Sequence, residues 1–319
     1  MSYRYWLCFL TYFLSLPSLA GGFKAYTQIV GFGDSTTDTG NACPKDGKDQ
    51  AMILCPLYRS SGFSDGTIWI EHLAKRMRLE LKPSRENGFN FAFGGATRGW
   101  GTEIPGLRRQ VHTYLEKVED RANPDALYAI WIGGNDFKNE FMGLSFLRDP
   151  RNLLFQELLD DICHAVIRLS RKGARHFLIP NLPPVHQTPL AEGALKGFSR
   201  AISGLSFLLT GNSQTLDFVS YFQTSLETVI RLYNAQLDLR LRALKADLLE
   251  KKGLDVQIHH PDVFGMFKDA EANFKAYGLR HPDELFCFDH FHPSAKAHAL
   301  LDYKFAHILG WGRFLEART

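Results

Sequence analysis

The stretch that decides the fold is Gln28-Ile29-Val30-Gly31-Phe32, which is followed at once by Gly33-Asp34-Ser35-Thr36-Thr37-Asp38-Thr39-Gly40-Asn41. An apolar run that ends in small polar residues predicts a strand that meets a functional loop or the start of a helix. Open α/β sheets carry their sites at the carboxyl ends of the strands. The Ser35 hydroxyl is therefore a candidate for contact with a substrate, although a polar turn that merely caps a helix accounts for this stretch equally well.

The same strand-to-loop pattern recurs along the chain. Two later strands end in glycine-rich clusters, Gly94-Gly95-Ala96-Thr97 and Gly133-Gly134-Asn135-Asp136. Strands that alternate with helices imply a parallel sheet covered on both faces, so the predicted fold class is α/β, with no second-domain boundary. Beyond 28–32, strands are predicted at 89–93, 125–132, 175–179 and 255–259, and helices at 66–79, 105–119, 152–171, 234–252, 263–274 and 294–309.

The composition is that of an ordinary globular protein. Of the 319 residues, 45% are hydrophobic and 22% are charged, which is usual for a folded domain. The formal charge of +3 is too small to indicate a nucleic-acid partner, and the sequence contains no dense Lys/Arg stripe. We therefore expect no nucleic-acid binding.

The amino terminus has the pattern of an export signal. Arg4 supplies a positive charge, the run from Tyr5 to Leu16 is nearly all apolar, and Pro17-Ser18-Leu19-Ala20 ends in small residues. This pattern predicts a signal peptide over residues 1–20 that is cleaved after Ala20, which leaves 21–319 as one secreted or periplasmic domain. The alternative is an uncleaved membrane anchor, but the apolar run is short for a membrane span.

Four cysteines follow the predicted cleavage site. In an oxidising compartment an even number permits disulfides. Cys43 and Cys55 bracket a short polar loop and are the best candidate pair. Cys163 falls on the apolar stripe of a predicted helix, which favours a buried free thiol. Cys287 has no assigned partner.

The segment from 193 to 232 is the least regular part of the sequence. It carries many apolar side chains among Ser, Gly and Thr. We expect a partly apolar helical insertion that packs on the core. The alternative is an apolar lid or a surface that binds an acyl chain.

Residues suited to nucleophilic acyl transfer occur towards both ends of the chain. This chemistry needs an activated hydroxyl, a base within hydrogen-bond reach, and donors where the oxyanion forms. Ser35 supplies the hydroxyl, His292 the base, and Asp289, three positions earlier, orients the imidazole. The oxyanion donors would be the backbone N–H groups of Ser35 and Gly95 and the side-chain amide of Asn135. Each donor follows a predicted strand, so all of them converge at one edge of the sheet.

Four blocks of the sequence, in order, resemble those of the GDSL (SGNH) hydrolase family. Any one block is weak evidence, but four in order, each where a strand should end, are strong. The resemblance runs from about Ile29 to the C-terminal helix and implies a flavodoxin-like, three-layer α/β/α sandwich with a parallel central sheet. The blocks are Gly33-Asp34-Ser35, the segment around Gly95, Gly133-Gly134-Asn135-Asp136 and Asp289-His290-Phe291-His292-Pro293.

The resemblance implies a role for each matched residue. Ser35 would be the nucleophile, with Asp289 and His292 completing the catalytic triad. The oxyanion hole would consist of the Ser35 backbone, Gly95 and Asn135.

Three neighbouring positions complete the match. Asp34 and Asp136 lie at motif positions that we interpret as structural supports. Thr36 departs from the family pattern, in which leucine follows the serine. Because this position flanks the nucleophile, the departure concerns local packing more than the chemistry.

Within the family, three segments are similar to the secreted bacterial lipolytic branch. That branch includes phospholipases A, lysophospholipases and glycerophospholipid:cholesterol acyltransferases. The segments are the opening Phe-Gly-Asp-Ser with Asp-Thr-Gly-Asn, the block Asn-Phe-Ala with Gly-Gly-Ala-Thr, and Asn181-Leu182-Pro183-Pro184.

The predicted function is therefore a secreted lipolytic serine esterase. It would cleave acyl esters of lysophospholipids or phospholipids through an acyl-enzyme, with a sterol as a second acceptor and transient contact with a membrane surface. One alternative is a carbohydrate or small-ester deacetylase on the same scaffold, and another is a non-catalytic lipid-binding protein. The histidines outside the motif show no paired spacing with Cys or carboxylates, so no metal or other cofactor is expected.

Overall fold

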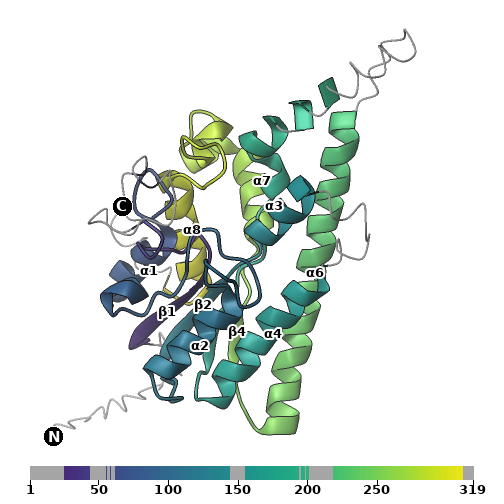
Figure 1. Ribbon diagram of the computed structural model, residues 1–319. Coiled ribbons are helices and arrows are strands. Elements are labelled where there is room, and N and C mark those ends of the chain that lie inside the picture. Colours follow the sequence, from purple (N-terminus) through teal and green to yellow (C-terminus); the bar gives the residue numbers. More distant parts are fainter. Residues whose placement is uncertain are drawn as a thin grey trace, which may run out of the picture.

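The centre of the molecule is a parallel sheet. The computed structural model describes residues 25–43, 55, 58, 62–143, 155–193, 195–197, 199–200 and 218–311. Within these residues the sheet has 4 strands in the order β1-β2-β3-β4 (Figure 1). β1 and β2 pair along their whole length, from Gln28 opposite Ala126 to Gly33 opposite Trp131. The strands are β1 (Gln28–Gly33), β2 (Ala126–Trp131), β3 (His176–Leu178) and β4 (Gln257–His259).

The predicted strand at 89–93 is only partly regular. Its backbone runs beside β1 on the edge opposite β2, because the Gly31 N–H donates to the Phe89 carbonyl at 3.0 Å and the Phe91 N–H donates to the Gly31 carbonyl at 2.7 Å. Only Asn90 forms a parallel bridge with Gly31. On its outer side Asn90 forms a second isolated parallel bridge, with Pro83, in which the Asn90 N–H donates to the Lys82 carbonyl at 3.0 Å and its carbonyl accepts the Ser84 N–H at 2.7 Å. The expected strand is therefore a short edge segment of the sheet.

Helices cover both faces of the sheet, and the strand residues alternate between them. Val30 and Phe32 point into one apolar cluster, whereas Ile29 points into the other. The first cluster is formed with α2 (Leu107–Lys117), α4 (Gln156–Arg171) and α6 (Phe218–Lys252), and the second with α1 (Trp69–Met77), α7 (Val263–Ala272) and α8 (Ala295–Ile308). The fold is the predicted three-layer α/β/α arrangement.

The short elements lie between these layers. α3 was not predicted as a helix, since its sequence begins with the polar Gly-Gly-Asn-Asp cluster. The Phe137 N–H donates to the Gly133 carbonyl at 3.0 Å, which starts the first turn directly after β2. The short elements are α3 (Gly134–Gly143) and the 3₁₀ turns η2 (Ser84–Glu86), η5 (Val185–Gln187), η6 (Phe274–Tyr277) and η7 (Pro282–Leu285).

The start of α6 joins two segments that the sequence analysis treated separately. Residues 218–232, expected to belong to the helical insertion, form one continuous helix with the predicted 234–252 segment. Serine and threonine are poor helix formers, but here their hydroxyls bond back to carbonyls four residues earlier, as Thr224 does to Ser220 at 2.8 Å and Thr228 to Thr224 at 2.8 Å. The rest of the insertion, 201–217, lies outside the described residues.

Two predictions about the amino terminus fall outside the described residues. The signal peptide at 1–20 and the alternative of a membrane anchor both concern residues that precede Ala25. Within the part of the chain that the structure describes, no helix has the length and apolar character required to cross a membrane.

Candidate active site

The end of β1 delivers Ser35 directly to the carboxyl edge of the sheet. Gly33 has a φ of +149°, and a Cβ at this position would lie 2.1 Å from the carbonyl oxygen of Trp131 on β2, so only glycine fits. Gln110 on α2 holds the same residue, because it accepts from the Gly33 N–H at 2.8 Å and donates to the Gly33 carbonyl at 2.9 Å. Ser35 comes two residues later and is buried, so the bonds that hold Gly33 also fix the backbone that leads to Ser35.

Ser35, His292 and Asp289 form one hydrogen-bonded chain. The Nε2 atom of His292 lies 2.7 Å from the Ser35 Oγ atom, and its Nδ1 atom bonds to Oδ2 of Asp289. The histidine and the aspartate share one tight turn between η7 and α8, which is closed by a bond from the Cys287 N–H to the His292 carbonyl at 2.9 Å. Residues that are 257 positions apart in sequence therefore meet as the sequence predicted.

The Asp289 carboxylate is held in its charged form. Its Oδ1 atom accepts the backbone N–H groups of Phe291 and His292, each at 3.0 Å. Burial alone would raise the pKa of this carboxyl, but the hydrogen bond and charge of His292, together with the two backbone donors, hold it well below its usual range. A charged carboxylate on Nδ1 leaves Nε2 of His292 free to accept the Ser35 proton.

The predicted oxyanion donors are placed unequally. Asn135, at the start of α3, is buried and lines the same cavity as Ser35. Its amide donates to the Ala96 carbonyl at 3.0 Å, which fixes the side chain and leaves a second amide proton. Gly95 precedes Ala96 and has a φ of +80°, but it is not among the described residues that line the cavity. Its oxyanion role stays a prediction.

The two carboxylates predicted as supports bind backbone and hydroxyl groups. Asp34 accepts the backbone N–H of Thr36 at 3.0 Å and its hydroxyl at 2.8 Å, so the threonine that replaces the family's leucine has a defined partner. Asp136, in the first turn of α3, accepts the Arg98 N–H at 3.2 Å. Burial raises the pKa of Asp136 to about 7, although the Arg98 N–H and guanidinium oppose this.

Asp38 is a structural residue to which the sequence analysis assigned no role. Its carboxylate accepts four backbone N–H groups, from Gly40 at 2.8 Å, Asn41 at 2.6 Å, Ala42 at 3.0 Å and Gly94 at 2.8 Å. These bonds join the loop after β1 to the loop after the edge segment. The Asp-Thr-Gly-Asn spelling is itself a turn signal, because aspartate side chains bond to nearby backbone N–H groups.

A small apolar cavity opens beside the Ser35 hydroxyl. Its volume is about 50 Å³. Phe267 on α7, Phe286 after η7 and Pro184 line both this cavity and a neighbouring one of about 290 Å³, so these side chains form the wall between the two. The rest of the first cavity is lined mainly by Trp131, Ile132, Leu182, Pro183, Val185 and Phe291 around Ser35, Asn135 and His292.

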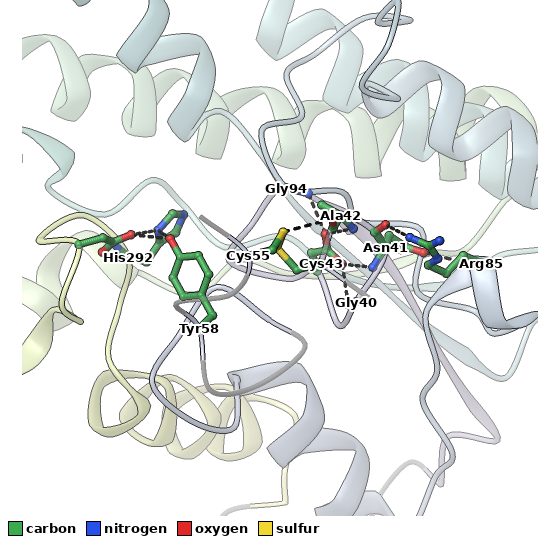
Figure 2. The surroundings of a disulfide bond; sticks show 11 residues. Gly40, Asn41, Ala42, Cys43, Cys55, Tyr58, Arg85, Gly94 and His292 are labelled. Carbon is green, nitrogen blue, oxygen red and sulfur yellow. Dashed lines mark hydrogen bonds and ion pairs between the residues drawn. A yellow bond between two sulfur atoms is a disulfide. The ribbon is translucent and has the colours of Figure 1, made fainter. Parts of the chain in front are cut away.

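The cysteines follow the predicted pattern with one difference. Cys43 and Cys55 form a disulfide (Figure 2). Cys163 is free, as predicted, but only half-buried. Cys287 is free and buried, and its thiol donates to Asp289 Oδ1 at 3.2 Å. Tyr58, which the sequence analysis did not single out, follows the disulfide and donates its hydroxyl proton to Asp289 Oδ2 at 2.8 Å.

The remaining histidines gather no metal ligands in the described part of the chain. No group of three or more His, Cys, Asp or Glu side chains there is arranged to hold a metal ion. His290, next to the triad, is exposed, and its carbonyl accepts the Leu190 N–H at 3.0 Å.

Comparison with known proteins identifies relatives of two substrate types. A phosphatidylcholine-sterol acyltransferase from Aeromonas hydrophila is 28% identical over 192 residues, which cover 59% of this chain and 54% of that protein. An acetylesterase from Thermothelomyces thermophilus is 27% identical over 179 residues, covering 50% of this chain and 55% of that protein. The matched region thus spans about half the length of these two relatives.

The chain is also similar to solved structures. One is a variant of an acetyl-xylooligosaccharide esterase from Geobacillus, which superposes with a TM-score of 0.49 at 15% identity and covers 90% of this chain and 96% of that chain. The assignment of the fold rests on the sheet order and helix layers described above.

A serine, an imidazole and a carboxylate in hydrogen-bond contact at the carboxyl edge of a parallel sheet define the class of α/β serine hydrolases. The sequence profile of the GDSL-like lipase/acylhydrolase family matches residues 29–303. The chain belongs to this family, whose members are carboxylic-ester hydrolases.

Proposed function

We propose that this protein is a secreted serine esterase that cleaves acyl esters of phospholipids and lysophospholipids through an acyl-enzyme. The observation that carries the proposal is the Ser35–His292–Asp289 chain, with 2.7 Å between Oγ and Nε2. The apolar lining of the adjoining cavity supports an acyl substrate, and so does the relative named as a phosphatidylcholine-sterol acyltransferase.

The proposed reaction begins with proton transfer to His292. As Nε2 accepts the Ser35 proton, Oγ attacks the ester carbonyl carbon, and Asp289 stabilises the imidazolium that forms. The carbonyl oxygen becomes an oxyanion, which the Asn135 amide and the backbone N–H groups of Ser35 and Gly95 would stabilise. The imidazolium then donates its proton to the leaving alcohol oxygen, which departs and leaves the acyl group on Ser35.

A second proton transfer releases the acyl group. His292 removes a proton from water, or from an acceptor alcohol such as a sterol, and the resulting oxygen attacks the acyl carbon. Collapse of the second oxyanion expels Ser35 Oγ, which recovers its proton from the imidazolium. Access of the acceptor and exclusion of water decide between hydrolysis and acyl transfer.

The experiment that tests the proposal combines labelling with product analysis. We expect a fluorophosphonate to label the wild type at Ser35. Ser35→Ala should not be labelled, and His292→Ala should be labelled much more slowly than the wild type. His290→Asn is the matched control, because it changes the adjacent exposed histidine and suits the left-handed backbone at that position. Absence of labelling in a folded wild-type protein would favour the non-catalytic lipid-binding alternative.

The substrate is tested with lysophosphatidylcholine, with and without cholesterol. Release of fatty acid supports hydrolysis, and formation of a sterol ester supports acyl transfer. Neither product, together with rapid turnover of acetyl esters, would support the second candidate, a deacetylase of small esters or carbohydrates. A specific observation favours that candidate: the cavity of about 50 Å³ is less than twice the ~30 Å³ share of one water molecule.

Export is proposed from two features. The amino-terminal pattern predicts cleavage after Ala20, and the Cys43–Cys55 disulfide is consistent with an oxidising compartment. Amino-terminal sequencing of the protein recovered outside the cytoplasm should begin at Gly21. A mature chain that retains Met1 would contradict this assignment.

A further inference from the structure

The contact of Tyr58 with the triad extends the chain of hydrogen bonds by one residue. The Tyr58 hydroxyl donates to Asp289 Oδ2 at 2.8 Å, the same oxygen that bonds to His292 Nδ1. It also lies 3.3 Å from that nitrogen. Figure 2 shows the Tyr58 ring reaching the His292 turn from the side of the disulfide. The phenol therefore contacts the Asp289 carboxylate, on which the basicity of the imidazole depends, and also lies close to the imidazole itself.

Tyr58 is fixed from three directions. Its ring is only 8% exposed and packs against Phe63, with ring centroids 5.0 Å apart, and against Phe288 at 5.1 Å. Its backbone N–H donates to the carbonyl of Cys55 at 3.2 Å, and Cys55 is bonded to Cys43. A buried phenol held in this way keeps its hydroxyl on Asp289 in the absence of substrate.

The hydroxyl acts as a donor under all ordinary conditions. Burial, followed by the hydrogen bond and charge of Asp289, raises the pKa of Tyr58 well above its usual range. A neutral phenol that donates to a carboxylate disperses part of the carboxylate's negative charge. Less charge on Asp289 stabilises the imidazolium of His292 less, so the phenol weakens the imidazole as a proton acceptor.

We propose that Tyr58 is a positioning residue of the catalytic site, which holds Asp289 in place and tunes the basicity of His292. The inference rests on the proposed function, because it concerns how readily Ser35 is activated. It adds a fourth member to the Ser35–His292–Asp289 chain, and this member comes from the disulfide-bonded loop rather than from the four family blocks.

Other ionisable groups surround His292 and must be held constant. Each stays unchanged when only the phenol is altered, so a difference between wild type and variant reports on Tyr58. The groups are Asp34 after β1, which also interacts with Lys138 on α3, His298 on α8, and Cys287, which contacts Asp289 and interacts with Asp65.

The test is the pH dependence of fluorophosphonate labelling of Ser35 in Tyr58→Phe. We expect the acidic limb to move upward by about one pH unit, which makes labelling roughly tenfold slower on the acidic side while the rates converge at alkaline pH. Tyr114→Phe is the matched control, because it also removes a buried hydroxyl, one that contacts Tyr128 at 2.9 Å in the core. We expect its profile to match that of the wild type.

Two results would overturn the inference. One is a profile of Tyr58→Phe that coincides with the wild type, and the other is a decrease by the same factor at every pH. If Tyr58→Phe does not fold, 3,5-difluorotyrosine at position 58 replaces it. This residue is a stronger donor, so the acidic limb should move downward, and an unmoved or raised limb would contradict the proposal. A wild type that is not labelled at all refutes the proposed function instead.

Discussion

At the scale of single residues, the site is built from carboxylates whose surroundings differ. Asp289 accepts donors from both sides and is kept charged beside His292. Asp136 is buried, and its pKa is raised to about 7. Side chains of one type therefore have distinct tasks, since desolvation disfavours the charge that hydrogen bonds and a neighbouring cation favour.

Asn135 should affect turnover far more than folding. Because its amide lines the cavity and is fixed by the Ala96 carbonyl, Asn135→Ala should lower kcat a hundredfold or more, the usual loss for one oxyanion donor, or roughly 3 kcal/mol. The measurement is steady-state hydrolysis of a soluble ester together with the melting temperature. A folded variant with wild-type kcat would show that Asn135 is not an oxyanion donor.

Asp136 should make stability depend on pH. Burial raises its pKa from 3.8 to about 7, so the folded state binds this proton more tightly than the unfolded state. The associated stability is present below about pH 4 and is lost as the pH rises through 7. Asp136→Asn retains an acceptor for the Arg98 N–H but cannot ionise. Between pH 4 and 8 the free energy of unfolding of Asp136→Asn, measured with urea, should rise by about 4 kcal/mol relative to that of the wild type.

The exposed Asp120 provides the comparison for this measurement. Its side chain is 58% exposed and pairs with Lys172 at the surface, so Asp120→Asn should parallel the wild type within a few tenths of a kcal/mol. A constant difference between Asp136→Asn and the wild type across this pH range would refute the prediction.

At the scale of elements, the sheet edge was predictable and its supports were not. Two of the family blocks lie where a strand ends, with Ser35 after β1 and Asn135 after β2, because apolar runs and small polar residues are local signals. The block from Asp289 to Pro293 corrects the prediction that each block ends a strand, since it lies in the turn between η7 and α8. Tyr58 gave no such signal, since its contact with Asp289 spans 231 positions of sequence. The continuity of α6 over residues 218–252 was not predicted, because the Ser and Thr hydroxyls at its start lower helix propensity unless they bond back to the helix.

The wall between the two cavities should set the length of the acyl group. Phe267→Ala or Phe286→Ala would connect the cavity at Ser35 with the one of about 290 Å³, and the joined space reaches the lower end of the roughly 300–1,000 Å³ usual for ligand pockets. We expect the ratio of octanoate to acetate turnover, measured with p-nitrophenyl esters, to rise at least tenfold. Phe274→Ala, on η6 and outside both linings, is the control.

One result for the ratio of octanoate to acetate turnover would contradict this prediction. If both wall variants keep the wild-type ratio and remain folded, the second cavity does not receive the acyl chain.

At the scale of the whole molecule, the alternation of strands and helices and the order of the blocks were enough to predict the three layers. The sequence did not reveal which side chains are exposed on the surface near the triad. Leu190 and Phe288 are 48% and 47% exposed. Leu190 lies in a helical turn and Phe288 in the turn before His290, and the two segments are joined by the bond from the Leu190 N–H to the His290 carbonyl. Both side chains thus lie beside residues that adjoin the triad, because Leu190 is bonded to His290 and Phe288 packs against Tyr58 with ring centroids 5.1 Å apart. We propose that the two side chains contact a membrane surface.

This pair should matter most for aggregated substrate. Leu190→Ser/Phe288→Ser should lower hydrolysis of phospholipid in vesicles at least tenfold, because burial of each apolar side chain contributes about 1.5–3 kcal/mol. Turnover of a soluble acetate ester should fall by a much smaller factor, because Phe288 contacts Tyr58 but neither side chain lines the cavity at Ser35. Leu249→Ser, 52% exposed near the end of α6 that precedes β4, is the control. Equal losses on vesicles and on the soluble ester would contradict the role in surface contact.

The four donors around Asp38 have a consequence for chemical rescue. They surround a carboxylate as a receptor surrounds a small anion, except that here the anion is tethered to the chain. Asp38→Gly removes the carboxylate and should leave its four backbone N–H donors around a space that formate fits. Added formate should then restore several degrees of the lost melting temperature, and chloride at equal ionic strength should restore less. In this variant, binding of formate would thereby control whether the two loops beside Ser35 stay joined.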